Sequence, residues 1–390
     1  MIVAGVMSGT SADGIDVALV KIAGMAQYLH LRLVAHEHFP YPPRVREAVL
    51  AAMNASSARV ADLAKLNSLL GELYADAVAA TQRRHRTQAD LVGVHGQTLY
   101  HQGDPLPFLG RKLSSTWQMG ESAIVARRLQ VPVISDFRPA DMAAGGKGAP
   151  LVPLLDVAFY AHRTKLRVLQ NIGGIANLTI IPAGQHLGNT RKIIAFDTGP
   201  GNMVIDSCAE LLLGRRYDRN GAVAAQGRVI RTALAKALSD PFFRRKPPKT
   251  AGREEFGREF VADFLSWRRN GSKQDTLATA TALTAASIGR ALRQVLAISR
   301  IPVPLNRRRA DYVVSGGGAA NKTLMRMICD EVEPLGFRVL TSDDLGMPSQ
   351  AKEAVAFALL AYQTWHRKPG NVPTATGASY PAILGKISYA

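Results

Sequence analysis

Residues 193–206 read IIAFDTGPGNMVID. The apolar run 193–196 leads into Asp197 and then into the glycine- and proline-containing residues 198–202. This pattern predicts a buried strand that ends in a tight turn, and the apolar spacing after it predicts a helix. The carboxylate would then stand at the carboxyl end of a strand, where open α/β sheets bind ligands. Glycine amides and a helix N-terminus beside it can hold phosphate, although a turn or capping role for Asp197 is the alternative.

The composition describes a globular chain of two domains. It has 390 residues, 47% of them hydrophobic and 20% charged, which is too long for one ordinary core. The chain contains no run of 18 or more apolar residues, so no transmembrane helix is expected. Its start, MIVAGVMSGT, lacks the basic region of a signal peptide. Two cysteines cannot build a disulfide framework or a metal cluster, so we expect a cytoplasmic protein.

The formal net charge of +18 raises the question of nucleic-acid binding. The basic residues form scattered short clusters, and aromatic residues, at 6%, do not interleave with them. This distribution favours solvated faces and attraction for small anionic ligands, so no nucleic-acid partner is expected.

Other apolar runs also end in glycine-rich turns. Residues 2–7 predict a strand that enters the turn 8–14 and returns as a second strand, and residues 166–181 repeat this arrangement. Such turns can offer several amides to a phosphate, although an ordinary hairpin explains each of them equally well. The repetition indicates two similar lobes.

Further segments supply polar residues at expected strand or helix ends. Residues 90–94 predict a strand ending at His95, and residues 311–314 predict one that runs into three glycines. Glu353 heads a helix with a strong apolar stripe, where a carboxylate is most often a dipole partner. Residues 145–150 read GGKGAP, which predicts a linker and domain boundary and not a Walker motif, because Lys147 is not followed by Ser or Thr.

Taken together, these motifs resemble the anhydro-N-acetylmuramic acid kinase family of the sugar kinase/actin/hexokinase superfamily. They occur in order over nearly the whole chain, and their joint presence is far more specific than any one of them. The motifs are MSGTSADGID (7–16), GVHGQT (93–98), DFRPADMAAGGKGAPLVP (136–153), NIGGIANL (171–178), FDTGPGNMVID (196–206), KTAGREEF (249–256), SGGGAAN (315–321), EAVAFALLA (353–361) and PGNVPTATGA (369–378).

The resemblance implies an α/β fold of two actin-like, ribonuclease-H-like lobes, with mixed sheets flanked by helices and an ATP cleft between them. We expect an N-terminal lobe over residues 1–140 and a C-terminal lobe over residues 141–366. The segment from about 367 to 390 is expected to pack back on the first lobe.

The family's reaction is ATP-dependent opening of the 1,6-anhydro ring of anhydro-N-acetylmuramic acid with phosphorylation of O6. The product is N-acetylmuramic acid 6-phosphate, an intermediate of cell-wall recycling. The implied cofactors are ATP and Mg²⁺, the partners are ATP and the anhydro sugar, and a homodimer is left open. Asp197 is expected to be the base that activates water, because hydrolysis at an anomeric carbon needs a carboxylate.

The same resemblance implies the binding residues. Asp13 is also a candidate for water-mediated contact with Mg²⁺, with a turn role as the alternative. Arg138 suits a substrate carboxylate, because guanidinium binds carboxylate through two hydrogen bonds. The nucleotide side is expected to comprise Gly9, Thr10, Ser11, Asp13, Gly14, Asp16, Gly173, Gly174, Asn177, Gly199, Gly201, Asn202, Gly316, Gly317, Gly318 and Asn321. The sugar side is expected to comprise His95, Gln97, Arg138, Asp141 and Glu353.

Three positions depart from the family pattern. Lys147 replaces the expected Gln, Pro139 stands where a basic residue is common, and Ala251 stands where Thr is common. The first two put local substrate contacts in question.

Three other functions remain to be tested. A ribonuclease-H-type nuclease would need clustered carboxylates for two metals. An actin-like or chaperone-like ATPase would act on no small substrate, and a kinase for another sugar would phosphorylate an ordinary hexose.

Overall fold

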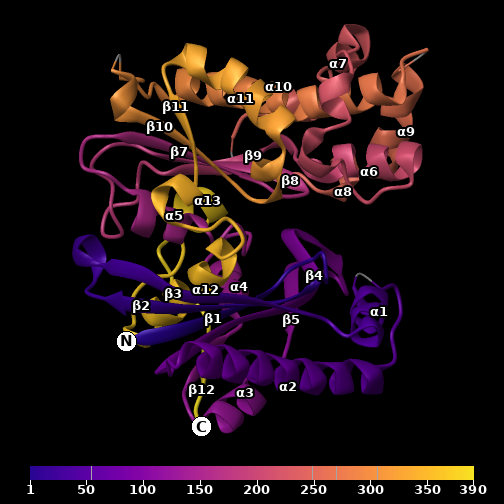
Figure 1. Cartoon of the computed structure of the whole chain (residues 1–390). Coiled ribbons are helices and arrows are strands. Elements are labelled where there is room, and N and C mark those ends of the chain that lie inside the picture. Colours follow the sequence, from indigo (N-terminus) through magenta and orange to yellow (C-terminus); the bar gives the residue numbers. More distant parts are fainter. Residues whose placement is uncertain (54, 248, 269, 305) are drawn as a thin grey trace. The chain divides into compact units, whose positions relative to one another are not determined.

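The computed structural model describes residues 1–390 except positions 54, 248, 269 and 305 (Figure 1). Unit 1 comprises Met1–Tyr160, His186–Arg191 and Ala351–Ala390. Unit 2 comprises Ala161–Gln185 and Lys192–Gln350. The divisions therefore fall after Tyr160 and Gln350, and not at the expected positions 140 and 366. The reason is that helices α5 (Pro153–Tyr160) and α12 (Lys352–Trp365) pack with each other and with unit 1.

Unit 1 is built on a mixed sheet with strand order β12-β6-β4-β1-β2-β3, and β5 pairs with β4. Strands β1, β2 and β3 are successively antiparallel, whereas β4 runs parallel to β1 and β6 parallel to β4. The strands are β1 (Ile2–Ser8), β2 (Gly14–Ala23), β3 (His30–Pro40), β4 (Leu91–Phe108), β5 (Arg111–Met119), β6 (Val133–Ser135) and β12 (Lys386–Ser388).

Helices cover both faces of this sheet (Figure 1). Helix α12 packs so closely on β1 and β4 that neither Gly5 nor Gly93 has room for a side chain. A Cβ at Gly5 would stand 1.8 Å from the Ala354 carbonyl oxygen, and a Cβ at Gly93 would stand 2.3 Å from the Phe357 carbonyl oxygen. Glycine is therefore required at both positions. The remaining helices of the unit are α1 (Pro43–Ala52), α2 (Val60–His85), α3 (Ser122–Leu129), α4 (Phe137–Ala143) and α13 (Pro373–Thr376).

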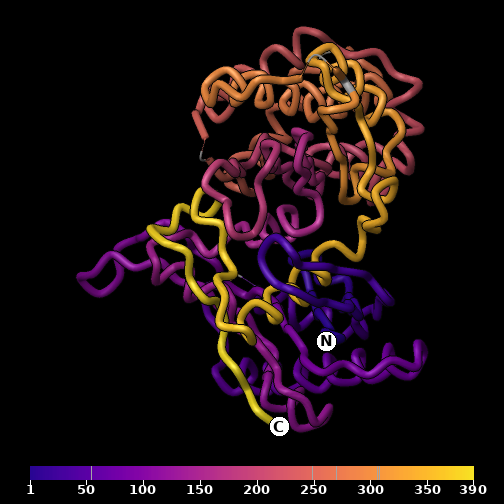
Figure 2. Tube along the Cα trace, turned by 90° about the vertical axis from the view of Figure 1, so that its left-hand side faces the viewer, coloured from indigo at the N-terminus to yellow at the C-terminus, as the bar shows by residue number. Residues whose placement is uncertain are grey.

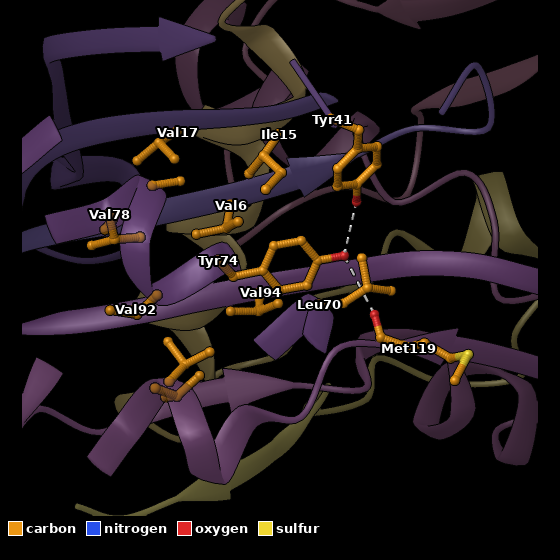
Figure 3. Close-up of a cluster of buried hydrophobic side chains, with 14 of the residues drawn as sticks. Val6, Ile15, Val17, Tyr41, Leu70, Tyr74, Val78, Val92, Val94 and Met119 are labelled. Carbon is orange, nitrogen blue, oxygen red and sulfur yellow. Dashed lines mark hydrogen bonds between the residues drawn. The ribbon is translucent and has the colours of Figure 1, made fainter. Parts of the chain in front are cut away.

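The opposite face of the sheet packs on α2 (Figure 3). The Tyr74 ring lies among Val6, Ile15 and Val94, and its side chain is completely buried. A buried phenol must satisfy its hydroxyl, and Tyr74 does so through Ser8 Oγ at 2.7 Å and the Met119 carbonyl at 3.4 Å. This contact places a polar network directly beneath the end of β1.

Unit 2 contains a five-stranded mixed sheet in the order β11-β10-β7-β8-β9. Strands β7, β8 and β9 are successively antiparallel, whereas β10 is parallel to β7 and β11 to β10. This is the same order and the same set of directions as β1, β2, β3, β4 and β6 of unit 1, so the predicted duplication is confirmed at the level of topology. The strands are β7 (Leu166–Ile172), β8 (Ile175–Ile181), β9 (Ile194–Pro200), β10 (Ala310–Ser315) and β11 (Arg338–Thr341).

Helix α10 (Lys273–Ser299) is the long central helix of unit 2 and packs against β9, α6 and α11. Its start is fixed by a capping box in which Ser272 Oγ accepts from the Asp275 amide at 3.0 Å. A hydrophobic cluster rich in phenylalanine forms part of the core of unit 2 and includes buried residues of α6 and α9. The other helices are α6 (Asn202–Leu213), α7 (Arg231–Ala237), α8 (Arg253–Phe256), α9 (Arg258–Trp267) and α11 (Lys322–Val332).

Two strands extend further than the sequence predicts. Strand β9 continues through Asp197 to Pro200, so Asp197 lies within the strand and not at its end, and Gly201 precedes α6 directly. Strand β4 likewise continues through His95 and forms a long hairpin with β5. In both cases pairing with the neighbouring strand keeps the backbone extended through glycine, proline and polar residues. In the sequence alone such residues are typical of turns.

The segment expected to be a linker, residues 145–150, instead belongs to unit 1. The Lys147 amide donates to the Thr376 carbonyl at 2.9 Å, which ties this loop to the C-terminal segment. That segment runs along unit 1 and ends beside β6, where β12 adds an antiparallel strand (Figure 2). No helix in the described part of the chain is long and apolar enough to cross a membrane.

One completely buried carboxylate, Asp311, holds three strands of unit 2 together. It accepts from Lys165 Nζ at 3.1 Å, Arg167 Nε at 3.3 Å and Arg338 Nη2 at 2.9 Å. Burial opposes ionisation of Asp311, but the hydrogen bonds from Lys165 and Arg338 outweigh it, so its pKa lies below the usual value.

We expect Asp311→Asn to lower the free energy of unfolding of unit 2 by about 2 kcal/mol near pH 7. This loss is smaller than for a fully buried ion pair, because the three cations are partly exposed to solvent. A carboxyl whose folded pKa is depressed stabilises above its unfolded pKa of about 4, and this contribution is lost as the pH falls through the folded pKa. Urea unfolding at pH 7 and below pH 4 checks this, with the exposed Asp330→Asn as control. A difference that is the same at both pH values would contradict it.

Candidate functional site

The glycine turns of unit 2 are hydrogen-bonded to each other. The Gly201 amide donates to the Gly174 carbonyl at 2.9 Å, the Asn202 amide to the Gly173 carbonyl at 2.8 Å and the Met203 amide to the Gly174 carbonyl at 3.0 Å. The β7–β8 turn is thereby fixed against the start of α6, and segments predicted separately from the sequence form one structure.

The glycines that follow β10 join the same structure. Gly316 has φ +82°, and a Cβ there would lie 2.7 Å from Asn171 Oδ1, so this position favours glycine. A Cβ at Gly317 would be 3.6 Å from Asn202 Nδ2, and one at Gly174 would meet only Met203 Cε at 3.7 Å. The backbone here is bare enough for a flat ligand to approach it closely.

Three residues predicted on the nucleotide side have well-defined positions within unit 2. Gly318 is buried against Ile172, and Asn321 caps α11 by accepting from the Leu324 amide at 3.0 Å. Asn177 lies opposite Asp197 in the β8–β9 ladder. These residues shape the turns from behind.

Asp197 is half-buried, and two contacts tie it to the segment at residues 249–251. Its amide donates to the Lys249 carbonyl at 3.0 Å, and its Oδ2 accepts from the Ala251 amide at 2.8 Å. Burial raises the pKa of Asp197 to about 6, against the lowering effect of the Ala251 hydrogen bond. A carboxylate with this pKa is ionised near neutral pH and is a better proton acceptor than an exposed one.

The first turn of unit 1 presents short polar side chains. Thr10, Ser11 and Asp13 are exposed, and Ser11 Oγ donates to Asp13 Oδ1 at 2.8 Å. At Gly9 a Cβ would meet only Ser11 Oγ, at 3.7 Å, so the backbone is open there. Amides and hydroxyls in such a turn suit phosphate oxygens.

Gly14 and Asp16 lie on β2, behind that turn. A Cβ at Gly14 would clash with the Phe39 carbonyl at 2.3 Å, so β3 packs tightly there. Asp16 Oδ1 lies 3.1 Å from both His36 Nε2 and His38 Nδ1. Asp16 is therefore bonded within the sheet, and the sequence interpretation did not identify either histidine.

Gln97, predicted on the sugar side, supports the turn from beneath. It is completely buried, and its Nε2 donates to the Gly9 carbonyl at 3.0 Å while Oε1 accepts from Tyr41 Oη at 3.5 Å. Tyr41 in turn contacts the Tyr74 hydroxyl (Figure 3). That hydroxyl also bonds Ser8 Oγ. These tyrosines come from a loop and a helix that carry no local signal of a site.

His95 and Arg138 form a direct pair in unit 1. Arg138 donates to His95 Nε2 from Nη2 at 2.9 Å and from Nε at 3.2 Å, and its Nη1 donates to the Gly148 carbonyl at 2.8 Å. Burial and the neighbouring guanidinium hold the pKa of His95 well below its usual range. His95 is therefore a neutral acceptor that orients Arg138, with its ring 4.6 Å from that of Phe357.

The contacts of Arg138 leave part of its guanidinium fork available. A guanidinium carries five N–H groups, and the three bonds above use one on each nitrogen. Among the described residues, no further acceptor bonds the second N–H of Nη1 or of Nη2. Those two parallel donors match a carboxylate.

Glu353, at the first turn of α12, is exposed. Desolvation by the surrounding protein raises its pKa, partly offset by the attraction of Arg138 and reinforced by Asp16 and Asp13. Glu353 therefore interacts electrostatically with Arg138 and with the turn that carries Asp13 in the same unit.

Asp141 is not part of this group. It is completely buried, and its oxygens accept from Asn371 Nδ2 and Thr376 Oγ1, both at 2.7 Å, and from the Gly148 amide at 2.8 Å. Asp141 thus fastens the C-terminal segment to the glycine-rich loop, and its expected contact with the sugar stays a prediction. Lys147 Nζ lies 2.9 Å from Asp104 Oδ1 on the β4–β5 hairpin.

Within the described residues, no group of three or more His, Cys, Asp or Glu could hold a metal ion. Magnesium that arrives with a nucleotide needs only one or two protein contacts, and the exposed Asp13 suits that role.

The comparisons with known proteins place this chain. The family model for anhydro-N-acetylmuramic acid kinase matches residues 1–390. The chain belongs to the anhydro-N-acetylmuramic acid kinase family. Relatives bearing that name include one from Bacillus cereus (strain G9842), 42% identical over 392 residues that cover 100% of this chain and 99% of the relative. Another, from Caldanaerobacter subterraneus subsp. tengcongensis, is 42% identical over 395 residues, covering 99% and 96%.

Solved structures similar to this kinase family member are more distant. The activator of the 2-hydroxyisocaproyl-CoA dehydratase from Clostridium difficile, with bound ADPNP, is 15% identical with a TM-score of 0.43, covering 94% of this chain and 96% of that one. A ROK family glucokinase from Streptomyces griseus is 14% identical with a TM-score of 0.38, covering 93% and 99%. The family assignment rests on the sequence relatives.

Proposed function

We propose that this chain uses ATP to open the 1,6-anhydro ring of anhydro-N-acetylmuramic acid and to phosphorylate O6. The products are N-acetylmuramic acid 6-phosphate and ADP, and the reaction belongs in the cytoplasm, where ATP is available. The observation that carries the proposal is the half-buried Asp197 carboxylate, with its raised pKa, on strand β9, which leads into Gly201 and the start of α6.

Asp197 would take a proton from water as the water oxygen attacks C1 of the sugar. The bond between C1 and O6 then breaks, and O6 attacks the γ-phosphorus of ATP, from which ADP leaves. The water oxygen becomes the hydroxyl on C1, and the proton on Asp197 returns to solvent. Because O6 is captured by phosphorus, no second carboxyl group is needed to protonate it, unlike in an inverting glycosidase.

The nucleotide would be held mainly by backbone groups. In unit 2 the joined turns at Gly173–Gly174, Gly201–Asn202 and Gly316–Gly317 offer bare backbone, and in unit 1 the turn at Gly9–Asp13 offers amides and hydroxyls. Phosphoryl transfer depends on positioning and charge neutralisation, which such groups provide. Magnesium bound to the phosphates would supply further charge neutralisation, with Asp13 as its protein contact through water.

The sugar would be recognised by unit 1 residues. The two available N–H groups of Arg138 match the lactoyl carboxylate of the substrate, and His95 keeps that fork in place. Glu353, coupled to Arg138, would accept from a sugar hydroxyl. This division leaves Asp197 free for the water.

A single assay tests the proposal: ATP and 1,6-anhydro-N-acetylmuramic acid, against glucose and N-acetylglucosamine, with products identified by mass spectrometry and phosphorus NMR. The expected product contains the elements of water and one phosphoryl group more than the anhydro sugar, with one ADP formed per turnover. Phosphorylation of an ordinary hexose alone would indicate a different sugar kinase, and ADP without a sugar phosphate would indicate an ATPase.

A further inference from the structure

The segment at residues 249–251 forms two hydrogen bonds with Asp197, one to its main chain and one to its carboxylate. The Lys249 carbonyl accepts from the Asp197 amide at 3.0 Å, and the Ala251 amide donates to Asp197 Oδ2 at 2.8 Å. Both the main chain and the carboxylate of Asp197 are thus held by one short stretch, 54 residues distant in the sequence.

These contacts distinguish the two carboxylate oxygens. Oδ2 is engaged by the Ala251 amide, while among the described residues no donor bonds Oδ1. The oxygen left to meet a water molecule is therefore Oδ1. The contact at 251 is made by the main chain, so it does not depend on which side chain stands there, and Ala251 is compatible with it.

Lys249 anchors this segment in the interior of unit 2. Its side chain is 6% exposed, and Nζ donates to the Phe242 carbonyl at 3.2 Å and lies 4.3 Å from the centre of the Phe242 ring. Phe242 packs edge-to-face on Phe256, 5.2 Å between ring centres, in the phenylalanine-rich core. A buried ammonium is costly unless it is compensated, so a neutral apolar residue would serve better if packing were its only role.

We propose that Lys249 is a positioning residue for Asp197, which orients the carboxylate through its segment and stabilises its ionised form by charge. This inference rests on the proposed function, since it assigns Lys249 a role through the proposed base.

The charges around the two residues agree with this role. The Lys249 ammonium and the Ala251 amide lower the pKa of Asp197, whereas burial and the Glu255 carboxylate raise it. Burial, with Arg290 and Arg245, lowers the pKa of Lys249 to about 8, against the attraction of Asp197. Between about pH 6 and pH 8 the carboxylate and the ammonium are both charged.

The inference is tested by the pH profile of kcat/KM, whose acid limb should shift in opposite directions in two variants. In Lys249→Met the loss of the cation should raise the pKa of Asp197 and move the acid limb from near pH 6 upward by about one pH unit. Glu255→Gln, which keeps an oxygen to accept from the Gly252 amide, should move it downward. Lys249→Arg retains the charge and should leave the limb near its original position.

A merely structural role predicts a different result, namely a fall in kcat of equal size at every pH with both limbs unmoved. That outcome would overturn the inference while leaving the proposed function intact, provided that Asp197→Asn is inactive. If Asp197→Asn is instead fully active, the assignment of Asp197 as the base fails and this inference with it, whereas the proposed function itself fails only if the assay with ATP and the anhydro sugar gives no sugar phosphate. Should Lys249→Met not fold, Lys249→Gln replaces it, since glutamine is neutral and can still donate to the Phe242 carbonyl, and an unmoved acid limb in that variant contradicts the charge argument.

Discussion

Asp197→Asn is expected to lower kcat by about 10²–10⁴-fold, the range contributed by a general base, while the affinities for ATP and for the anhydro sugar stay nearly unchanged. Asparagine has the same shape and can still accept from the Ala251 amide through its one oxygen, which preserves the local geometry. It cannot take a proton from water. The effect should therefore appear in turnover and not in binding.

Steady-state kinetics with both substrates and calorimetric titration of each ligand separate these two quantities. Asp263→Asn, an exposed carboxyl on α9 of the same unit, is the matched control and should retain normal turnover. Near-normal kcat in Asp197→Asn would refute the assignment of the base, and a large loss of ATP binding would point to a nucleotide contact instead.

The second large effect concerns the ion pair between Asp156 of α5 and Lys352 of α12. Their charged atoms are 2.8 Å apart, and both side chains are only 4% exposed. Removing one partner of a buried pair leaves the other charge uncompensated, so Asp156→Ala should lower the free energy of unfolding by about 3–5 kcal/mol. Thermal and urea unfolding would measure this loss.

The double variant Asp156→Leu with Lys352→Met is its control. It removes both charges and fills their space with apolar groups, which is often close to neutral for a buried pair. We expect the double variant to unfold near the wild-type midpoint. If it is as unstable as Asp156→Ala, the loss comes from packing between α5 and α12 and not from removal of the carboxylate that compensates the buried ammonium.

The sequence predicted the parts of the site that depend on local patterns. Glycine turns after apolar strands, and their duplication, indicate two similar sheets, and the structure confirms both sheets and joins the turns at 173–174, 201–202 and 316–317. Whether Asp197 ends a strand could not be decided locally, because pairing with β8 carries β9 on through Thr198, Gly199 and Pro200.

The residues that local patterns could not identify are those whose partners are distant in the chain. Asp141 lies within a motif that suggests a ligand contact, yet its partners Asn371 and Thr376 are more than 200 residues away and bury it completely. Lys249 opens the motif KTAGREEF, but nothing local connects that motif to Asp197, and Tyr41 belongs to no motif, because their roles depend on contacts with Asp197 and Gln97 across the fold.

The division of the chain also determines the order in which it can fold during synthesis. Unit 2, interrupted only by His186–Arg191, is synthesised and emerges from the ribosome before the segment Ala351–Ala390 emerges. Until then the nascent first sheet lacks α12 over Gly5 and Gly93, and lacks the β12 strand beside β6. Since domains fold as units during translation, the half encoded second should reach its native state first, and the half encoded first should wait, with an apolar face uncovered, for the last forty residues.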